Sequence, residues 1–555
     1  MSNSEQQIEI RFLGKVGYSE AVDLQRGLVE HATSPYVLVL EHFDVITIGR
    51  SGDLANIVAA GETPVVPTDR GGDVTWHGPG QVVCYPIVDL GDDPGAAKAH
   101  VCTLENALAT VVRAVADVKQ IGEVGRLAGH PGIWVNLDSD TPRKVGAVGV
   151  RSVRNAQGIR RSMHGVSLNV DCDLDRFRAI VPCGLERPVT SLKALGVTAS
   201  SREIAELVGY EVAKCLRPEA TIRSVAVMVG GSGIEGAQPV SLKRLTQAGV
   251  DHATALPISQ RKPEWLRSMV RLSDAVATTR SAVSSNRLVT VCEEAGCPNL
   301  SECWSDGTAT FMVNGADCTR RCGFCLIGTA KPQALDADEP RRVAQAVAEL
   351  GLAHAVVTCV ARDDLSDGGA SGVANTIAAI RATSKDTQVE VLISDCKGDG
   401  PSLDLIFSER PDVLNHNIET VARLQRAVRP SAGYARSMAV LARAEQQGLV
   451  TKSGLMVGLG ETMDEVIETL SDLAAVGVKI VTVGQYLRPT SAHLPVARYY
   501  EPEEFALIGE QGRRLGLSHI ESSPLTRSSY HAKRAASGVA APTTLRVSLS
   551  LKESH

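Results

Sequence analysis

The stretch 310-TFMVNGADCTRRCGFCLIG-328 decides the fold of the second half of the chain and the chemistry placed on it. Its first six residues are mostly β-branched or apolar and predict a strand. Three cysteines follow directly, at Cys318, Cys322 and Cys325. Thiolates bind soft and borderline metals, so three of them in one tight loop can supply three of the ligands of a single metal site. The spacing C-x3-C-x2-C therefore predicts a metal centre just after a strand.

The number of cysteines in this loop bears on which metal it holds. Structural zinc usually takes four Cys or His ligands from paired C-x2-C knuckles, and a zinc loop is one alternative here. A [4Fe-4S] cluster held by three cysteines leaves one iron open, and an open iron can bind a small molecule such as S-adenosylmethionine through its amino and carboxylate groups. The missing fourth ligand favours the iron-sulfur cluster.

Strand-like runs recur on both sides of amphipathic helical segments throughout the second half. Six β/α units of roughly 30 residues each predict a parallel α/β barrel, whole or partial. Functional residues of such barrels lie on the loops that follow the strands, which is where the three cysteines fall. The further predicted strands are at 354–360, 389–394, 412–418, 451–460 and 479–487, with helices that include 339–351 and 463–477.

A second group of three cysteines precedes the first, with the spacing C-x4-C-x5-C at Cys292, Cys297 and Cys303. C-x3-C-x2-C at the start of a β/α barrel resembles the radical S-adenosylmethionine superfamily. The two groups of cysteines together resemble lipoyl synthase, over about 259–555. Further segments that carry the resemblance are RKPEWLR (261–267), DDLSDGGA (363–370), NHNIETVARLQRAVRP (415–430), GLGET (458–462) and RSSYHA (527–532).

This resemblance implies two [4Fe-4S] clusters and S-adenosyl-L-methionine as cofactors. The cluster on Cys318, Cys322 and Cys325 would reduce S-adenosylmethionine to a 5'-deoxyadenosyl radical, which takes hydrogens from C6 and C8 of a protein-bound octanoyl chain. The auxiliary cluster on Cys292, Cys297 and Cys303 would give up sulfur to those carbons. The resemblance also implies Ser529 as the fourth ligand of the auxiliary cluster, and an electron donor such as flavodoxin or ferredoxin as a partner.

Two features of the barrel segments leave alternatives open. At Ala361 the resemblance leads us to expect an acidic residue, so no function is carried over to that position. Polar side chains at the end of the fourth predicted strand either contact adenosyl or substrate groups or form buried hydrogen bonds that hold the barrel rim. These side chains are Asn415, His416, Asn417 and Glu419.

The first 220 residues mix strand-like and helical runs and predict a mixed α+β domain. Glycine-rich turns place backbone N–H groups close to a ligand, and a cysteine within Pro-Cys-Gly can be held exposed. Four segments with these features resemble lipoate octanoyltransferase, which implies the fold shared by biotin and lipoate protein ligases. They are RGGDVTWHGPGQ (70–81), KVGAVGVR (144–151), HGVSLN (164–169) and VPCGL (181–185).

The octanoyltransferase resemblance assigns Cys183 and Lys144 as catalytic residues. Cys183 would attack an octanoyl thioester on acyl carrier protein, and a lysine of a lipoyl-accepting domain would then attack the acyl-enzyme. Lys144 would lower the thiol pKa by its charge and move protons. His77 and His164 either assist proton transfer or are structural. The substrate pocket would be formed by Arg70, Gly71, Gly72, Asp73, Val74, Thr75, Trp76, His77, Ala147, Val148, Gly149, Gly165, Val166 and Ser167.

A basic stretch follows Lys144. Residues 151–161 contain four arginines and no acidic residue: Arg151, Arg154, Arg160 and Arg161. One interpretation is a solvated loop. The other is that these arginines steer the acidic acyl carrier protein, so that loss of Arg160 and Arg161 would raise the apparent KM for carrier-bound octanoate.

The composition limits the class of protein. The chain has 555 residues, and 57 Lys+Arg against 63 Asp+Glu give a net charge of -6, which argues against a general nucleic-acid or membrane-surface binder. With no long apolar run and no hydrophobic signal core, a cytoplasmic location is expected. We expect an octanoyltransferase domain at 1–221, a flexible linker with one short helix at 222–258, and a lipoyl synthase domain at 259–555.

The expected protein is thus a bifunctional enzyme, an acyltransferase and sulfurtransferase of lipoate biosynthesis, with no nucleic-acid or membrane partner. Two alternatives belong to other classes. One is an ATP-dependent lipoate or octanoate ligase fused to a radical S-adenosylmethionine enzyme. The other is an iron-sulfur or zinc sensor on an inert barrel.

Overall fold

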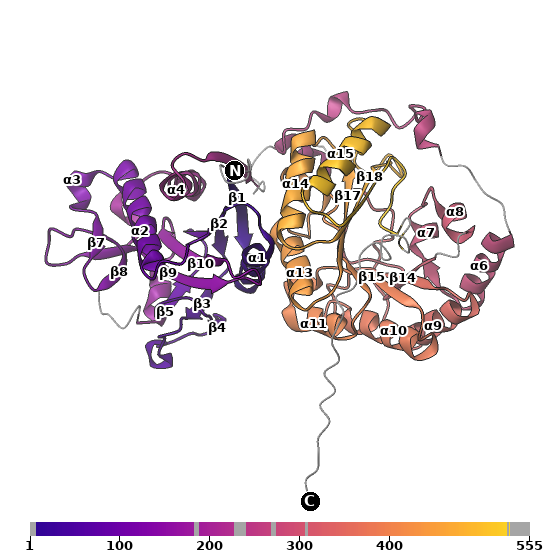
Figure 1. The fold of residues 1–555 in the computed structure, drawn as a ribbon, viewed down its shortest axis with the longest axis horizontal. Helices are drawn as coiled ribbons and strands as arrows, with labels where there is room; N and C mark the ends of the chain where they lie inside the picture. The colour runs from indigo at the N-terminus through magenta and orange to yellow at the C-terminus, as the bar shows by residue number, and fades with distance from the viewer. Residues whose placement is uncertain are drawn as a thin grey trace, which may run out of the picture.

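The structure is a computed structural model that describes residues 7–181, 188–226, 240–267, 274–305, 309–529 and 532. It contains two domains that lie side by side, an α+β domain formed by the first part of the chain and a β/α barrel formed by the second (Figure 1). Within the described residues, no helix combines the length and the apolar character needed to cross a bilayer.

The first domain is built on an eight-stranded mixed sheet in the order β11-β1-β2-β6-β10-β9-β8-β7, with a small three-stranded sheet β4-β3-β5 beside it. Its strands are β1 (Gln7–Val16), β2 (Tyr36–His42), β3 (Val45–Ile48), β4 (Val65–Pro67), β5 (Val74–His77), β6 (Gln81–Ile87), β7 (Gly125–Leu127), β8 (His130–Val135), β9 (Arg143–Arg154), β10 (Arg160–Asn169) and β11 (Thr221–Ala226). Its helices are α1 (Tyr18–His31), α2 (Ala96–Val115), α3 (Val118–Ile121) and α4 (Ser201–Leu216).

Strand β2 explains why this sheet has helices on both faces. Successive side chains of a strand point to opposite faces, and β2 is buried on both. Leu38 and Leu40 enter the apolar core that includes α1, whereas Val37 and Val39 enter the core formed with α2 and α4. The run YVLVLEH therefore forms a central strand.

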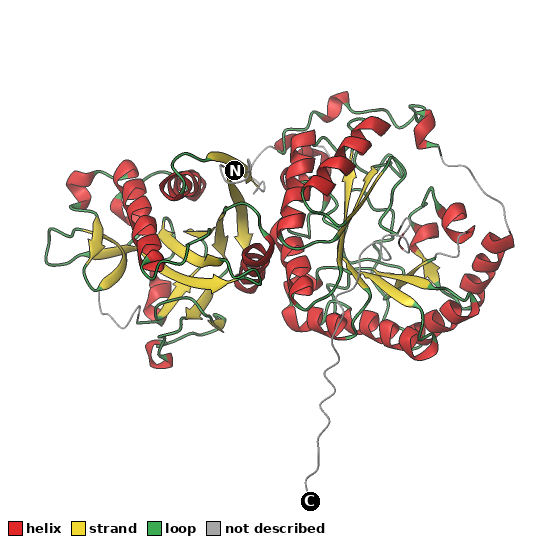
Figure 2. Ribbon diagram, in the orientation of Figure 1, coloured by secondary structure: helices red, strands yellow, loops and turns green. Residues whose placement is uncertain are grey.

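The second domain is an open barrel of parallel strands with helices around its outer surface (Figure 2). Its strands follow chain order: β12 (Val289–Thr290), β13 (Thr310–Val313), β14 (His354–Cys359), β15 (Gln388–Leu392), β16 (Val413–Asn415), β17 (Thr451–Val457), β18 (Ile480–Gln485) and β19 (His519–Ser522). Its helices are α5 (Val240–Gln247), α6 (Asp274–Ser285), α7 (Val291–Glu294), α8 (Leu300–Ser305), α9 (Glu339–Glu349), α10 (Ala370–Thr383), α11 (Gly400–Ser408), α12 (Gln425–Val428), α13 (Tyr434–Gln446), α14 (Met463–Ala475) and α15 (Pro502–Arg514).

The predicted barrel is confirmed, and all six predicted strands are present as β13 to β18. Two further strands extend the sheet at its ends. β12 is antiparallel to β13, and β19 is parallel to β18. Neither was predicted: β12 has two residues, and β19, His519–Ser522, alternates polar residues with a single aliphatic one, whereas β13 and β16 lie within longer apolar runs.

The segment expected as a flexible linker, 222–258, has regular structure at both ends. Thr221–Ala226 forms β11, which pairs with β1 in parallel. Helix α5 lies in the expected short-helix region, and Leu245 and Val250 are buried in the core shared with the barrel. Leu256 N–H donates a hydrogen bond to the Val496 carbonyl. These contacts place β11 in the first domain and 240–258 on the barrel.

The two domains pack directly against each other through α1 of the first and α13 and α14 of the second (Figure 1). Leu24 and Leu28 of α1 belong to the same apolar core as Met438 of α13. Gly27 permits the close approach of the helices, because a Cβ atom there would lie 2.8 Å from Ala442 Cβ. A single apolar core therefore crosses from one domain into the other.

A buried ionic network closes the same interface. Arg11 Nε of β1 lies 2.9 Å and 3.0 Å from the two carboxylate oxygens of Asp472 on α14. The hydroxyl of Tyr36 donates to Asp472 from the first domain and that of Tyr434 donates from the barrel. The side chains of Arg11 and Asp472 are 3% and 8% exposed. Removing one partner of such a pair leaves an uncompensated buried charge, so each domain depends on the other here.

Two candidate active sites

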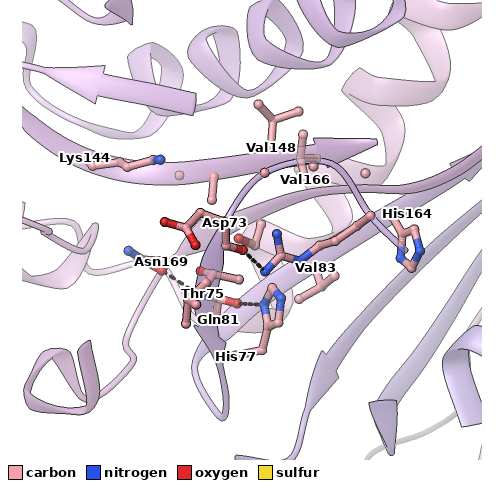
Figure 3. Close-up of a pocket in the computed structure, with 18 of the residues that line it drawn as sticks. Asp73, Thr75, His77, Gln81, Val83, Lys144, Val148, His164, Val166 and Asn169 are labelled. Atoms are coloured by element: carbon pink, nitrogen blue, oxygen red, sulfur yellow. Dashed lines mark hydrogen bonds between the residues drawn. The ribbon is translucent and has the colours of Figure 1, made fainter. Parts of the chain in front are cut away.

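The first candidate site is a cavity of about 60 Å³ in the first domain, between β5, β6, β9 and β10 (Figure 3). Antiparallel pairing of β9 with β10 brings Ala147 beside Ser167 and Val148 beside Val166. A Cβ atom on Gly165 would lie 2.2 Å from the Cys84 carbonyl oxygen, so only glycine allows β10 and β6 to approach this closely. The glycine-rich segments thus meet around one space.

Lys144 and all of the expected pocket residues except Gly71 and Trp76 line this cavity. Gly71 instead donates a backbone hydrogen bond to the Val150 carbonyl. Trp76 is 1% exposed and packs edge-on against Phe177, 5.2 Å between ring centroids. The side chain of Trp76 lies on the opposite face of β5 from that of Thr75, because side chains alternate along a strand.

Arg70 braces the wall of the cavity. Its guanidinium donates to the carbonyl oxygens of Thr47 and Asp73 and to the Thr47 hydroxyl. Arg70 is 8% exposed. These bonds fix the turn between β4 and β5 against β3, so the buried guanidinium shapes the pocket.

A chain of buried hydrogen bonds connects His77 to the strand that carries Lys144, and Figure 3 shows its first part, from His77 through Gln81 to Asn169. His77 Nδ1 lies 2.6 Å from Gln81 Oε1, and Gln81 Nε2 donates to Asn169 Oδ1. Asn169 then donates to the Thr190 carbonyl, and Thr190 N–H donates to the Lys144 carbonyl. Sequence reasoning missed Gln81 and Asn169 as site residues, although both lie in the quoted segments RGGDVTWHGPGQ and HGVSLN.

Cys183 lies outside the described residues, and the chain on both sides of it is anchored near Lys144 and the cavity. Val181 N–H donates to the Asn56 carbonyl, and Lys144 N–H donates to the Pro188 carbonyl. Val189, one residue further, lines the cavity. The Lys144 ammonium lies 5.6 Å from the centre of the Trp134 ring, a cation–π contact that orients the side chain.

His77 and His164 are neutral at physiological pH. Burial first, and then neighbouring cationic groups including Arg70, lower the pKa of each imidazole to about 3. His164 Nε2 lies 2.8 Å from Asp69 Oδ1, and Arg151 also pairs with Asp69. Because the imidazole is uncharged, its contact with Asp69 is a hydrogen bond donated to a carboxylate that Arg151 already neutralises.

The buried histidines predict a pH dependence of stability. An unfolded histidine takes up a proton as the pH falls below about 6.5, whereas folded His77 remains neutral to about pH 3. The unfolded state therefore binds more protons in this window, and stability is lost as the pH falls. Each such histidine contributes up to about 1.4 kcal/mol per pH unit to the free energy of unfolding.

Replacing His77 with Asn should reduce this slope between pH 6 and 4, measured by denaturant unfolding at several pH values. Between pH 7 and 8 the variant and the wild type should have parallel profiles. Equal slopes below pH 6 would show that His77 is not held neutral by burial.

The arginines proposed to steer the carrier protein have different roles. Arg161 is 8% exposed; it donates to the Leu28 and Val29 carbonyls at the end of α1 and pairs with Asp89. Arg161 is therefore buried at a helix terminus that its charge stabilises, and the steering of the carrier protein by these arginines stays a prediction. Arg154 pairs with exposed Asp92, and Arg160 donates to Ser152.

The second candidate site is the loop after β13 with Cys318, Cys322 and Cys325. Cys318 N–H donates to the Gly328 carbonyl, which closes the loop. Gly323 N–H donates to the Val428 carbonyl, and Leu494 N–H donates to the Gly323 carbonyl. Burial raises the pKa of the Cys322 thiol to about 12, and nearby Cys325 and Cys318 add to the shift. The three thiols therefore lie within electrostatic reach of one another.

Arg320 anchors this loop to the barrel. Its guanidinium donates to both oxygens of Asp363 and to Asp395 Oδ1, and its N–H donates to Cys318 Sγ at 3.4 Å. Burial alone would raise the pKa of Asp395, and Arg320 overcomes that cost and lowers it to about 2. Ala361, where an acidic residue was expected, contributes its carbonyl, which accepts from Thr319 N–H and hydroxyl.

The polar side chains at the end of β16 lie in two different surroundings. Asn415 and His416 form buried hydrogen bonds within the barrel, to Glu390 and to Ser437 and Ile393. Glu419, whose pKa burial raises, lies near Cys322 and Cys325, and Asn417 donates to Glu419 and to Ser528 Oγ. Asn417 and Glu419 therefore face the cysteine loop.

Cys297 of the upstream group lies beside the segment that contains Ser529. Asn299 Nδ2 donates to the Leu525 carbonyl, 2.7 Å away. Half-buried Arg527 is close enough to Cys297 for the two groups to influence each other's pKa. Ser528, next to Ser529, bonds to Asn417 on the barrel. The segment 525–529 thus connects the Cys297 region with the end of β16.

Both groups of cysteines offer thiolate sulfurs, which are the donor atoms that hold iron-sulfur clusters. Within the described ranges, no three His, Cys, Asp or Glu side chains converge as the ligands of a single metal ion. In a four-iron cluster each cysteine binds a different iron, so the ligands stand further apart than those around one ion. The thiols of the Cys318 loop lie near one another without pointing at one common atom position, which is the arrangement that a four-iron cluster requires.

Comparison with known proteins agrees with both sites. The family model for the lipoyl protein ligase A/B catalytic domain matches 17–212, and the radical SAM superfamily model matches 315–473. A lipoyl synthase of Rubrobacter xylanophilus is 53% identical over 49% of this chain and 85% of its own length. A lipoyl synthase of Xanthomonas oryzae is 46% identical over 57% of this chain and 97% of its own length.

Among solved structures, an archaeal bi-partite lipoate protein ligase from Thermoplasma acidophilum aligns at 14% identity with a TM-score of 0.31, covering 40% of this chain and 88% of that one. The two family matches and the two sites define an enzyme in which a lipoyl ligase or octanoyltransferase-type domain is fused to a radical SAM domain. The chain belongs to the lipoyl synthase family. It is an enzyme of lipoate biosynthesis, and its family implies S-adenosylmethionine and [4Fe-4S] clusters as cofactors.

Proposed function

We propose that this chain catalyses two consecutive reactions, octanoyl transfer from acyl carrier protein to a lysine of a lipoyl-accepting domain, followed by insertion of two sulfurs at C6 and C8. The observation that carries the proposal is the cavity of the first domain. The lining contains Lys144 together with residues of the two glycine-rich strand segments. The same chain also has the complete C-x3-C-x2-C loop of the radical SAM superfamily.

For the first reaction, the Cys183 thiolate attacks the octanoyl thioester carbonyl and the carrier's thiolate leaves, taking up a proton. The amine of the acceptor lysine then attacks the new thioester, and Cys183 leaves as a thiolate while the amine loses a proton. Lys144 stabilises the thiolate by its charge and passes protons. Backbone N–H groups around Gly165 and Val166 are candidates for stabilising the oxyanion.

Because a thioester retains the energy of the incoming acyl group, this route needs no nucleotide. The apolar walls at Val83, Val148 and Val166 suit an aliphatic chain, and His77 and His164 are neutral polar groups at the same cavity. The fixed chain His77–Gln81–Asn169–Thr190 supports the strand of Lys144 and keeps its ammonium in place.

For the second reaction, Cys318, Cys322 and Cys325 would hold a cluster that, when bound, would supply the electron for cleavage of S-adenosylmethionine. An electron donor such as flavodoxin or ferredoxin would be the partner that reduces it again. Asn417 and Glu419 lie beside the cysteine loop and provide polar atoms for the adenosyl or substrate groups. Cys292, Cys297, Cys303 and Ser529 would hold the auxiliary cluster that donates sulfur, with Arg527 providing positive charge beside Cys297.

The proposal is tested by metal content and by substrate requirement. Purified without oxygen and reconstituted, the chain should contain about eight irons and at least as many sulfides, as two four-iron clusters require. It should octanoylate a lipoyl-accepting domain from octanoyl carrier protein without ATP. About four irons would remove the auxiliary cluster from the account, and transfer only from free octanoate plus ATP would indicate a ligase.

A further inference from the structure

Helix α1 belongs to both halves of the enzyme. Its Tyr18 stacks on His77 of the cavity, 6.2 Å between ring centroids, and Gln25 Oε1 accepts from His164 N–H. From the same helix, Glu20 and Asp23 reach the barrel. This helix is therefore a physical connection between the octanoyl cavity and the barrel, and its barrel-facing carboxylates decide what the connection can influence.

Glu20 contacts the barrel at two places. Its Oε1 accepts a 2.7 Å hydrogen bond from Arg436 Nε at the start of α13. Its carboxylate also packs on the turn at 396–398, where a Cβ atom on Gly398 would lie 2.2 Å from Glu20 Oε1. Gly398 has φ of +79°, so the turn depends on glycine both for its conformation and for this contact. The turn directly follows Asp395.

Two arginines compensate the negative charge of Asp395. It is fully buried, and its Oδ1 accepts from Arg320, which holds the Cys318 loop. Its other oxygen, Oδ2, has no hydrogen-bond partner among the residues that the structure describes, and Arg436 Nη1 lies 3.8 Å from it. A buried carboxylate requires compensating charge, so Arg436 and Arg320 hold Asp395 from opposite sides.

The charges therefore alternate along a continuous path from the first domain to the cysteine loop: Asp363, Arg320, Asp395, Arg436 and Glu20. Because Glu20 binds Arg436 through Nε, it fixes the direction of the guanidinium and thereby its distance from Asp395. If Arg436 is displaced, Arg320 is the only cation left on Asp395 among the described residues, and we expect Arg320 and the loop it anchors to shift.

We propose that Glu20 and Arg436 are positioning residues for the radical half of the enzyme, so that the transferase domain helps to set the geometry of the Cys318 loop. The inference rests on the proposed function in one respect, that Cys318, Cys322 and Cys325 hold the cluster that binds S-adenosylmethionine. All the groups involved belong to this chain: the Glu20 carboxylate of the first domain acts on the cysteine loop through Arg436 and Asp395 of the barrel.

The chain offers a matched control on the same helix. Arg443 of α13 pairs with Asp23 of α1 at 3.1 Å across the same interface, but its other partner is Asp404. Arg436→Gln and Arg443→Gln therefore each remove one interdomain ion pair, and only the first reaches Asp395. Both should leave octanoyl transfer at the wild-type rate, since neither arginine touches the cavity.

Arg436→Gln should lower the rate of 5'-deoxyadenosine formation about ten-fold, the scale of residues that orient metal ligands, and change the electron paramagnetic resonance spectrum of the reduced cluster with S-adenosylmethionine. In the cluster-free protein, the same variant should alter the rate at which the peptide containing Cys318 reacts with a thiol reagent. Arg443→Gln should change none of the three. Equal behaviour of the two variants in all three measurements would overturn the proposal.

A charge exchange separates positioning from simple docking. In the double variant Glu20→Arg/Arg436→Glu the interdomain pair is restored with opposite polarity, but a glutamate then faces Asp395. We expect thermal stability to recover relative to Arg436→Glu, without recovery of 5'-deoxyadenosine formation. Recovery of both would reduce Arg436 to a docking contact. If the wild type itself does not cleave S-adenosylmethionine, the proposed function fails first, which distinguishes the two outcomes.

Discussion

Replacing Cys183 with alanine should lower the rate of octanoyl transfer by about 10³-fold or more, because the reaction loses its nucleophile and cannot form the acyl-enzyme. Lys144 cannot compensate, since in the proposed mechanism it stabilises a thiolate that no longer exists. The measurement is the initial rate of octanoylation of a lipoyl-accepting domain from octanoyl carrier protein. Mass spectrometry of the enzyme with the carrier alone should show an octanoyl adduct on the wild type only.

The second domain provides the internal control for this variant. Cys183→Ala should convert an already octanoylated domain into the lipoylated form at the wild-type rate, because Cys183 is not part of the barrel. Cys102→Ala, a change to a half-buried cysteine of α2 in the same domain, should retain octanoyl transfer. Retention of most of the transfer rate by Cys183→Ala would exclude the covalent route.

The two groups of cysteines should fail in different ways when one member is removed. Cys322→Ala should abolish cleavage of S-adenosylmethionine, because the cluster that supplies the electron loses a ligand. Cys297→Ala should still produce 5'-deoxyadenosine with an octanoylated substrate, but should form no lipoyl group because the sulfur source is missing. Both products can be followed in one reaction by chromatography and mass spectrometry.

Cys359→Ala provides a comparison, since Cys359 ends β14 near Cys318 but belongs to neither group of cysteines, and its thiol makes a long contact with the Leu392 carbonyl. It should keep both reactions. Lipoyl product from Cys297→Ala at the wild-type level would show that the sulfur comes from elsewhere. Loss of S-adenosylmethionine cleavage in Cys297→Ala, with the other cluster intact, would show that the two sites are not separate in function.

Local patterns predicted much of this enzyme. The six strand runs of the barrel and the helices between them are periodic and apolar, and the structure has them within a few residues of their expected ends. The cavity lining was expected from the resemblance to lipoate octanoyltransferase, which the glycine-rich segments carry. Antiparallel pairing of β9 with β10 brings two of these segments together at the cavity.

Contacts between distant parts of the chain were not predictable in the same way. Arg11 pairs with a residue 461 positions away, and nothing around Arg11 distinguishes it from a surface arginine. Arg161 appeared in a run of arginines without acids, yet it binds the end of α1. Gln81 and Asn169 carry the hydrogen-bond chain behind His77, and their role depends on Thr190, which only the fold brings close.

The packed interface changes the physical interpretation of the fusion. A flexible linker would act by raising the local concentration of the octanoylated acceptor. Here the buried pair of Arg11 and Asp472 and the shared apolar core hold the domains in contact. A fixed contact allows one domain to influence the other, which is the basis of the positioning assigned to Glu20 and Arg436.

The central claim, that one chain performs both reactions, is tested most directly by the intact mass of a lipoyl-accepting domain. The domain is incubated without oxygen with the reconstituted enzyme, octanoyl carrier protein, S-adenosylmethionine and a reductant. We expect the mass to rise first by one octanoyl group and then by the two sulfurs of a lipoyl group, with the octanoylated form as a transient. An unmodified domain, or one that stops at octanoyl while S-adenosylmethionine is cleaved, would contradict this claim.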